Sequence, residues 1–273
     1  MIHLENHRAI KGILLDLDGV LWRGSKPIPG AAETVKQLKA SGYAVRFVSN
    51  NSLLGSRGMH RHFERLGIDA QRSEIVLATE VLARALARKQ ARGTVYLLGS
   101  AGFREDLEAA GLRVIDEPEE IDYLTDFVVV GGDRELNYTK LTRALRCMLK
   151  GALLAAPNVD RTYPMEDGLL VPGTGAIVAA ITAMVRRGPE IMVGKPKPDL
   201  LLAAAQSAGL DPAECVMVGD TIDTDIQAAH AAGMRSILVL TGNATQEDAA
   251  AASPPPWRIA PSITDVPRLI AAA

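Results

Sequence analysis

The sequence predicts an α/β protein, with a doubly wound, Rossmann-like core of parallel strands and an inserted α/β domain. Short apolar strands alternate with amphipathic helices along most of the 273 residues, which is typical of parallel sheets. Four polar segments each follow an apolar strand. The second and third of them, at Ser49 and Lys195, lie roughly 145 residues apart, whereas one βαβ unit takes ~30 residues. The middle of the chain is therefore expected to hold a domain of its own.

The composition is that of an ordinary globular protein, with 48% hydrophobic and 23% charged residues. A formal net charge of −2 gives no indication of a nucleic acid or an anionic membrane as partner. Cys147 and Cys215 are far apart and in no metal-binding spacing, which favours reduced core cysteines in a cytosolic protein. Residues 1–12 contain no apolar signal-peptide core. We therefore expect a cytoplasmic protein.

The uncharged run at 169–185 is at the short limit for a membrane span. Pro172, Gly173 and Gly175 interrupt its first third, and the part that remains is too short to cross a bilayer. The run therefore predicts a turn followed by a buried helix at about 176–185, in a soluble protein.

The elements of the core come from both ends of the chain, which we assign as residues 1–90 and 187–273. Apolar runs predict its strands, and amphipathic stretches that end at glycines such as Gly42 and Gly67 predict its helices. The predicted strands are 13–15, 44–48, 190–196, 215–220, 236–240 and a short one at 257–260. The predicted helices are about 30–41, 56–66, 79–90, 198–208, 222–232 and a last one near the end, with Ser262 and Asp265 as a capping box.

The inserted domain is assigned to residues 91–186, which repeat the strand and helix alternation. Its predicted strands are 94–100, a short one at 113–116, 126–132 and 152–158. Its predicted helices are 101–110 and 136–150, followed by the buried helix described above.

The first polar segment, Asp16-Leu17-Asp18-Gly19, directly follows the strand at 13–15. Residues i and i+2 of a strand project to one side, so both carboxylates can converge just past the strand end, where open α/β sheets bind ligands. Two carboxylates this close repel each other, and a hard cation such as Mg²⁺ would allow both to stay ionised. Two solvated acids in a loop are the alternative.

The second and third segments supply donors and a cation. Ser49 and Asn50 can donate hydrogen bonds to a phosphate oxygen, or they can be turn and capping residues of the next helix. Lys195 lies in a turn that Pro196 and Pro198 stiffen, and it is a compact charge suited to phosphate. A solvated lysine is the alternative.

The fourth segment, 219–225, is the most acidic turn of the chain, with Asp220, Asp223 and Asp225. A helix N-terminus favours acids, which explains one or two of them. Parallel strands place all four segments on one edge of a sheet. Acids, a divalent cation, a lysine and hydrogen-bond donors together are what in-line phosphoryl transfer needs.

In order and spacing, the four segments resemble the four motifs of the haloacid dehalogenase superfamily: DLDGV, Ser49 with its NNS turn, Lys195 in GKPKPD, and GDTIDTD. The segments NVD (158–160) and GLLVPGTGA (168–176) resemble the cap of the subfamily with the NagD-type and p-nitrophenyl phosphatases, phosphoglycolate phosphatase and pyridoxal phosphatase. The resemblance covers roughly residues 10–270, and it implies a cap domain inserted into the core.

The resemblance implies a Mg²⁺-dependent phosphatase that hydrolyses small phosphomonoesters through an aspartyl-phosphate. Asp16 would be the nucleophile and a Mg²⁺ ligand. Asp18 would be the general acid and base, with its backbone carbonyl on the metal. Asp220 would be the third protein ligand, and Asp225 would orient the metal shell from the second layer.

Ser49, Asn50 and Lys195 would hold the phosphoryl group. In the cap, Asn158 and Asp160 are candidates for substrate contacts, as are Tyr163 and the loop 173–175, for which turn residues are the alternative. Two positions depart from the family pattern: Ser49 stands where threonine is frequent, and Thr221 stands where a basic residue is frequent, which affects substrate contacts.

Other functions stay open at this stage. A phosphotransferase or mutase on the same scaffold often carries a helical cap between the first two motifs, and here one βαβ unit fills that interval. A signalling receiver domain would need about half this length, and a non-catalytic phosphate-binding protein would not need the full set of acids. The sequence does not identify the phosphorylated metabolite. A homodimer also stays open, because related caps often mediate dimers.

Overall fold

The computed structural model describes residues 9–164 and 169–272 and divides into two compact units. The first contains the chain up to Ser49, His60–Val76 and the chain from Lys195 onward; the second contains Asn50–Met59 and Leu77–Gly194. The predicted insertion, 91–186, falls wholly within the second unit. Two predictions fall partly outside the described residues. They concern residues 1–8, where no signal peptide was expected, and Gly168, the first residue of the predicted cap segment 168–176.

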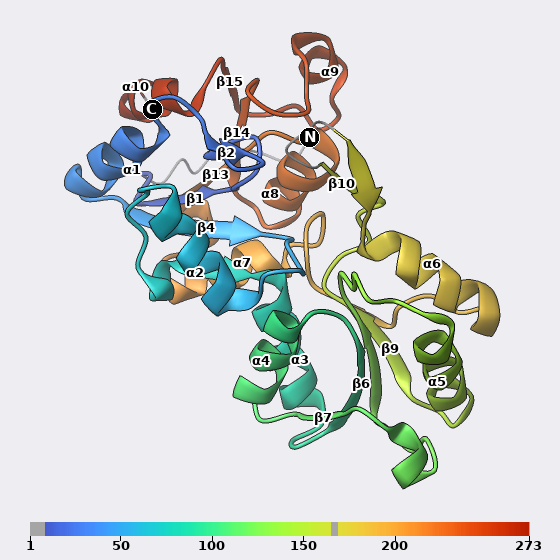
Figure 1. The fold of residues 1–273 in the computed structure, drawn as a ribbon. Helices are drawn as coiled ribbons and strands as arrows, with labels where there is room; N and C mark the ends of the chain where they lie inside the picture. Colours follow the sequence, from blue (N-terminus) through green and yellow to red (C-terminus); the bar gives the residue numbers. More distant parts are fainter. Residues whose placement is uncertain (1–8, 165–168, 273) are drawn as a thin grey trace. The chain divides into compact units, whose positions relative to one another are not determined.

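The first unit is built on a six-stranded sheet with the order β15-β14-β13-β1-β4-β5 (Figure 1). From the central strand β1 the chain proceeds outward through β4 to β5, and it later returns beside β1 and proceeds the other way through β13, β14 and β15. β1 pairs in parallel with both β4 and β13. This reversal confirms the doubly wound topology and places the switch point between β1 and β13. The strands are β1 Gly12–Leu15, β4 Ala44–Ser49, β5 Ile75–Leu77, β13 Cys215–Gly219, β14 Arg235–Val239 and β15 Arg258–Ala260.

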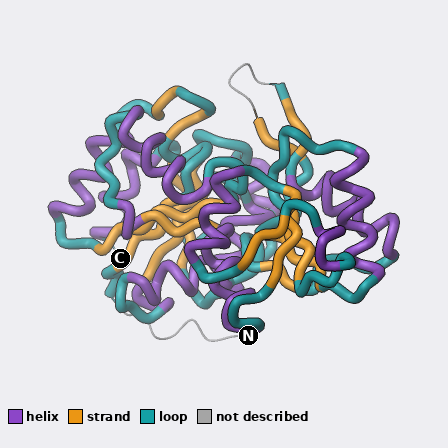
Figure 2. The backbone as a smooth tube through the Cα atoms, turned by 60° about the horizontal axis from the view of Figure 1, so that its bottom comes forward, coloured by secondary structure: helices purple, strands orange, loops and turns teal. Residues whose placement is uncertain are grey.

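Helices lie around the strands of the protein (Figure 2), and in the first unit a small hairpin follows β1. The predicted helix at 222–232 is divided into a π-helical turn, Ile222–Ile226, and the short helix α8. The predicted capping box at Ser262 is absent: Ser262 accepts a hydrogen bond from Thr264 N, and Asp265 pairs with Arg268. The helices are α1 Ala31–Ala40, α2 Gly55–Arg65, α7 Asp199–Ser207, α8 Gln227–Ala231, α9 Gln246–Ala251 and α10 Val266–Ala271, and the hairpin is β2 Trp22–Arg23 with β3 Lys26–Pro27. Only the part of α2 from His60 onward belongs to this unit.

The second unit contains a five-stranded parallel sheet with the order β12-β9-β8-β6-β7. One assignment from the sequence is wrong here. The run at 190–196 was expected to extend the core sheet, but only Ile191 and Met192 form a strand, and they pair with Ala155 and Ala156 of β9. The strands are β6 Thr94–Leu98, β7 Arg113–Ile115, β8 Phe127–Val130, β9 Leu153–Ala156 and β12 Ile191–Met192.

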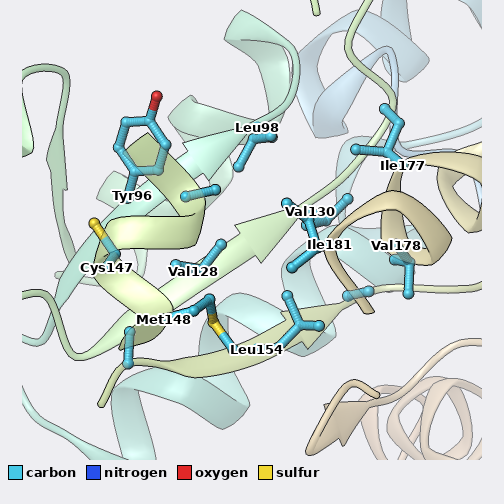
Figure 3. Close-up of a cluster of buried hydrophobic side chains, with 13 residues drawn as sticks. Tyr96, Leu98, Val128, Val130, Cys147, Met148, Leu154, Ile177, Val178 and Ile181 are labelled. Atoms are coloured by element: carbon cyan, nitrogen blue, oxygen red, sulfur yellow. The ribbon is translucent and has the colours of Figure 1, made fainter. Parts of the chain in front are cut away.

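Helices α5 and α6 pack on this second sheet around a cluster of buried apolar side chains (Figure 3). Val128 and Val130 of β8 and Leu154 of β9 meet Ile181 of α6 there, because alternate residues of a strand face the same side. Cys147 of α5 belongs to this cluster, as expected for a reduced core cysteine. The helices of the unit are α3 Ala78–Lys89, α4 Ala101–Ala109, α5 Tyr138–Leu149 and α6 Thr174–Val185, with α2 as far as Met59.

The uncharged run at 169–185 is only partly as predicted. It begins as a strand, β11 Leu170–Pro172, which pairs with β10 Thr162–Pro164 in an antiparallel hairpin, and it continues as the partly buried helix α6. Among the described residues, no helix combines the length and the apolar character that crossing a membrane requires.

Candidate active site

In the first unit, acidic residues follow the two strands that flank the switch point. β1 is buried along its whole length, and Asp16 comes directly after it, with its backbone N–H donating to the carbonyl of Val218 on β13 at 2.9 Å. Asp220 comes directly after β13, which is also fully buried. Because β1 and β13 are neighbouring parallel strands, the two carboxylates lie at the same edge of the sheet.

Lys195 lies between two of the acids, as a buried residue with 3% of its side chain exposed. Its Nζ donates to Oδ1 of Asp16 at 2.6 Å and to Oδ1 of Asp225 at 2.6 Å. The strand that precedes Lys195 belongs to the second sheet, so Lys195 does not reach the acids from the end of a core strand. It reaches them through the turn that follows β12.

Asp225 is completely buried, and its side chain binds the backbone at the start of the acidic turn to which it belongs. Its Oδ2 accepts hydrogen bonds from the backbone N–H groups of Asp220 and Thr221, both at 3.1 Å. Gly219 makes room for this arrangement, since a Cβ there would lie 2.3 Å from the side chain of Asp225. The carboxylate that the sequence assigned to the second layer is therefore fixed between Lys195 and the backbone of the fourth motif.

These contacts bring three carboxylates together. Ligand oxygens of Asp16, Asp220 and Asp225 all lie within 4.8 Å of one another, and the described residues contain no other such group of acids, cysteines or histidines. Burial raises the pKa of Asp16 well above its ordinary value, and the charges of Asp225 and Asp220 raise it further, while Lys195 opposes the shift. Burial, and then the charge of Asp225, raise the pKa of Asp220 to about 6. A cation beside these oxygens would stabilise their ionised forms.

For Lys195, burial and the neighbouring charges act on the pKa in opposite directions. Burial alone would lower the pKa of its ammonium group, but the carboxylates of Asp16 and Asp225 outweigh this and raise the pKa above its ordinary value. Lys195 therefore stays charged and neutralises part of the acidic cluster.

Asp18, which the sequence predicted beside the metal, is not part of this group of three carboxylates. Asp18 is an exposed residue, yet desolvation by the surrounding protein raises the pKa of its carboxyl to about 6, against a hydrogen bond from Trp22, the charge of Lys195 and a hydrogen bond from the Gly24 backbone. Ser49 is the last residue of β4, the other neighbour of β1, and 6% of it is exposed. Both residues belong to the first unit: Asp18 follows the same strand as Asp16, and Ser49 ends β4, the strand beside it.

The remaining sequence candidates, Asn50, Asn158 and Asp160, form a closed ring of hydrogen bonds within the second unit. Asn158 is fully buried and donates through Nδ2 to the Asn50 carbonyl at 2.6 Å, while its Oδ1 accepts from Asp160 N at 3.1 Å. Asp160 Oδ2 in turn accepts from Asn50 Nδ2 at 3.3 Å. Both polar atoms of the Asn158 side chain therefore have protein partners, and its predicted contact with substrate stays a prediction.

A second polar group in this unit joins three hydroxyls. Thr174 and Ser52 are both fully buried, with their hydroxyl oxygens 2.9 Å apart, and the Tyr163 hydroxyl lies 3.3 Å from Ser52 and 3.2 Å from Thr174. A Cβ on Gly173 or Gly175 would lie 2.2 Å from the carbonyl oxygen of Asp160 or Val159. These glycines therefore allow the start of α6 to pack directly on the 159–161 backbone.

The turn at 241–244, which follows β14, was not among the predicted site segments. The structure places this turn against Asp220: Asn243 N donates to Oδ2 of Asp220 at 2.7 Å, and Ala244 N donates to its carbonyl at 3.1 Å. The available signal was that this turn, like the segments at Asp16, Ser49 and Asp220, follows an apolar strand of the core.

Replacement of Lys195 with methionine is expected to lower the free energy of unfolding by about 3–5 kcal/mol, because it leaves two buried carboxylates without their cation. The measurement is urea denaturation in EDTA at neutral pH. Lys150→Met is the matched control, since Lys150 pairs with Asp122 at 2.7 Å on an exposed surface and such pairs contribute about 0–1 kcal/mol. Equal losses in the two variants would contradict the buried pairing.

Comparisons with known proteins agree with this geometry. Residues 13–113 match the haloacid dehalogenase-like hydrolase family, and residues 192–266 match a related family of HAD-hydrolase-like proteins. Chronophin of Rattus norvegicus is 39% identical over 249 residues, which cover 88% of this chain and 80% of chronophin.

Two solved structures share the fold over almost the whole chain. The p-nitrophenyl phosphatase of Archaeoglobus fulgidus aligns with a TM-score of 0.87 at 36% identity and covers 97% of this chain and 100% of its own. A glycerol phosphate phosphatase of Mycobacterium tuberculosis in complex with magnesium aligns with a TM-score of 0.86 at 32% identity, over 94% of this chain and 76% of its own. This chain therefore belongs to the haloacid dehalogenase-like hydrolases, among the NagD-type and p-nitrophenyl phosphatases, and is a phosphoric monoester hydrolase.

Proposed function

We propose that this chain hydrolyses small phosphomonoesters with the help of Mg²⁺ and through a phosphoryl group carried on Asp16. The observation that supports this most is the convergence of three carboxylates and the Lys195 ammonium group at the switch point of the first sheet. The relatives that act on p-nitrophenyl phosphate and glycerol phosphate support the choice of small esters.

The donor set fits Mg²⁺. Asp16, Asp220 and Asp225 offer only carboxylate oxygens, the ligand type that this cation prefers, and they lie close enough to share one ion. We assign Asp16 and Asp220 as ligands, together with the backbone carbonyl of Asp18. When bound, Mg²⁺ supplies positive charge that balances the phosphate oxygens and aligns the ester for in-line attack.

Asp16 acts as the nucleophile. One of its carboxylate oxygens attacks phosphorus, a new P–O bond to the aspartate forms, and the P–O bond to the ester oxygen breaks. Asp18 gives its proton to the leaving ester oxygen. Ser49 and Lys195 donate hydrogen bonds to the phosphoryl oxygens and hold the group in place.

The second step releases phosphate. Asp18, now ionised, takes a proton from a water molecule whose oxygen attacks phosphorus, and the bond to Asp16 breaks. Inorganic phosphate leaves, Asp16 is restored as a carboxylate, and Asp18 carries a proton again. Asp225 takes no part in bond making; it holds Lys195 and the backbone of the fourth motif in position.

Exhaustive chelation with EDTA is expected to abolish turnover of p-nitrophenyl phosphate, and added Mg²⁺ is expected to restore it. Ca²⁺ should restore little, because its looser coordination does not enforce the in-line geometry. EDTA that has been saturated with Mg²⁺ beforehand is the control and should not inhibit. Full activity after complete chelation would rule out the metal role of Asp220.

A further inference from the structure

The turn at 241–244, which follows β14, encloses the side chain of Asp220. Each carboxylate oxygen of Asp220 accepts one hydrogen bond from its surroundings. Asn243 N donates to Oδ2 at 2.7 Å, and the Thr221 hydroxyl donates to Oδ1 at 3.1 Å. The Asn243 side-chain amide donates to that hydroxyl at 3.0 Å and thereby directs its proton toward Asp220. One residue of the turn therefore orients both oxygens.

Two glycines from distant parts of the chain pack against the same carboxylate. A Cβ on Gly242 would lie 2.0 Å from Oδ2 of Asp220, and a Cβ on Gly19 would lie 2.5 Å from the same oxygen. Both distances are far below any contact between a Cβ and an oxygen that van der Waals radii permit. The absence of side chains at these positions thus fixes where the Asp220 carboxylate can lie.

The turn is also tied to the loop of the first motif. The Thr241 hydroxyl donates to the Gly19 carbonyl at 2.6 Å. The guanidinium group of Arg23 donates to the carbonyls of Thr241 and Gly242. All of these residues belong to the first unit. The turn therefore connects the segment that carries Asp16 and Asp18 with the segment that carries Asp220.

We propose that the turn at 241–244 is a positioning element for the divalent cation: Gly242, Thr241 and Asn243 set the orientation of Asp220 relative to Asp16. The inference rests on the proposed function, in which these two acids are ligands. Groups that orient a metal ligand typically contribute 10–100-fold to metal affinity. The turn acts through Asp220 and Gly19.

The test is isothermal titration of metal-free protein with Mg²⁺ alone, for Gly242→Ala and Thr241→Val. We expect the dissociation constant for Mg²⁺ to rise ~10–100-fold in Gly242→Ala, because the added methyl group displaces the Asp220 carboxylate. Thr241→Val keeps the shape of the side chain and removes only the donor to Gly19, so a smaller rise is expected. Gly188→Ala is the matched control, since a Cβ there meets nothing within 4 Å.

Asp220→Asn separates the two levels of the proposal. If it binds Mg²⁺ as the parent does, the metal site itself is wrong. If it weakens binding while Gly242→Ala and Thr241→Val, both folded by circular dichroism, bind Mg²⁺ within twofold of the parent, only the positioning role is overturned. Should Gly242→Ala fail to fold, Thr241→Val decides alone, and an unchanged dissociation constant in it overturns the proposal.

Discussion

Replacing Asp16 with asparagine is expected to lower turnover of p-nitrophenyl phosphate by roughly 10⁴- to 10⁶-fold, in the range seen when a catalytic nucleophile is removed. The amide oxygen is a poor nucleophile, and the other carboxylate after β1, that of Asp18, acts in the proposed mechanism as acid and base and not as a nucleophile. The partner of Lys195 also changes from a carboxylate to a neutral amide. Acid-quench trapping with a ³²P-labelled ester should therefore yield no labelled enzyme.

Asp223→Asn is the control for this experiment. Asp223 is an exposed acid of the fourth motif whose carboxylate accepts a hydrogen bond from Gln227 at 3.4 Å, and it should retain activity. If Asp16→Asn still traps label, Asp16 is not the residue that carries the phosphoryl group. A label mapped to Asp223 or Asp225 would move the nucleophile from the end of β1 to the turn after β13.

Replacing Asp18 with asparagine is expected to affect esters according to their leaving groups. The variant keeps the nucleophile and loses the proton that a leaving alkoxide needs. General acid–base assistance contributes ~10²–10⁴-fold, so glycerol phosphate should lose that much more activity than p-nitrophenyl phosphate, whose phenolate leaves without much help. The measurement is kcat/KM for both esters in the variant and the parent.

The same variant should accumulate phosphoenzyme. With p-nitrophenyl phosphate the first step proceeds, but the second lacks the base that activates water, so acid quench should trap labelled Asp16. The matched comparison is Asp16→Asn, in which no label is expected. Equal losses for the two esters, with no label in either variant, would refute the division of roles between Asp16 and Asp18.

Much of the fold could be predicted because its strands are short, apolar and followed by polar turns. β1 and β13 are buried on both faces and read as continuous apolar runs, which is typical of central parallel strands. β5, Ile75–Leu77, escaped prediction because three apolar residues directly before α3 cannot be told from the first turn of the helix. The hairpin that pairs β10 with β11 was missed for a similar reason, since each strand has only three residues.

The 190–196 run shows that a sequence pattern can predict a strand without predicting the sheet to which it belongs. An apolar run followed by a polar turn predicts a strand, but not which of two parallel sheets that strand joins. Pairing with β9 is a long-range choice made by packing in the second unit. Lys195 nevertheless donates a hydrogen bond to Asp16, because its side chain is long and because it lies in the turn after β12. The prediction of the residue was therefore independent of the prediction of its strand.

Asp16 and Asp220 could be predicted as neighbours from local motifs, but the structure groups Asp225 with them and not Asp18, and the turn that supports Asp220 was not predicted. Asp16 and Asp220 stand in patterns of unusual chemistry, with several acids directly after a strand. The turn at 241–244 consists of ordinary turn residues, and its importance depends on backbone N–H groups and on missing side chains. Neither of these leaves a chemical signature in a single sequence.

The π-helical turn at Ile222–Ile226 makes the fourth motif sensitive to length. The N–H of Ile226 reaches the carbonyl of Thr221, five residues back, and this wider turn directs Asp225 toward the backbone of Asp220. An in-frame loss of one codon would convert the turn to ordinary α-helix, so α8 could continue while Asp225 rotates by ~100° about the helix axis. Substitutions between Asp220 and Asp225 are therefore expected to be tolerated better than a deletion that changes the spacing of these two acids.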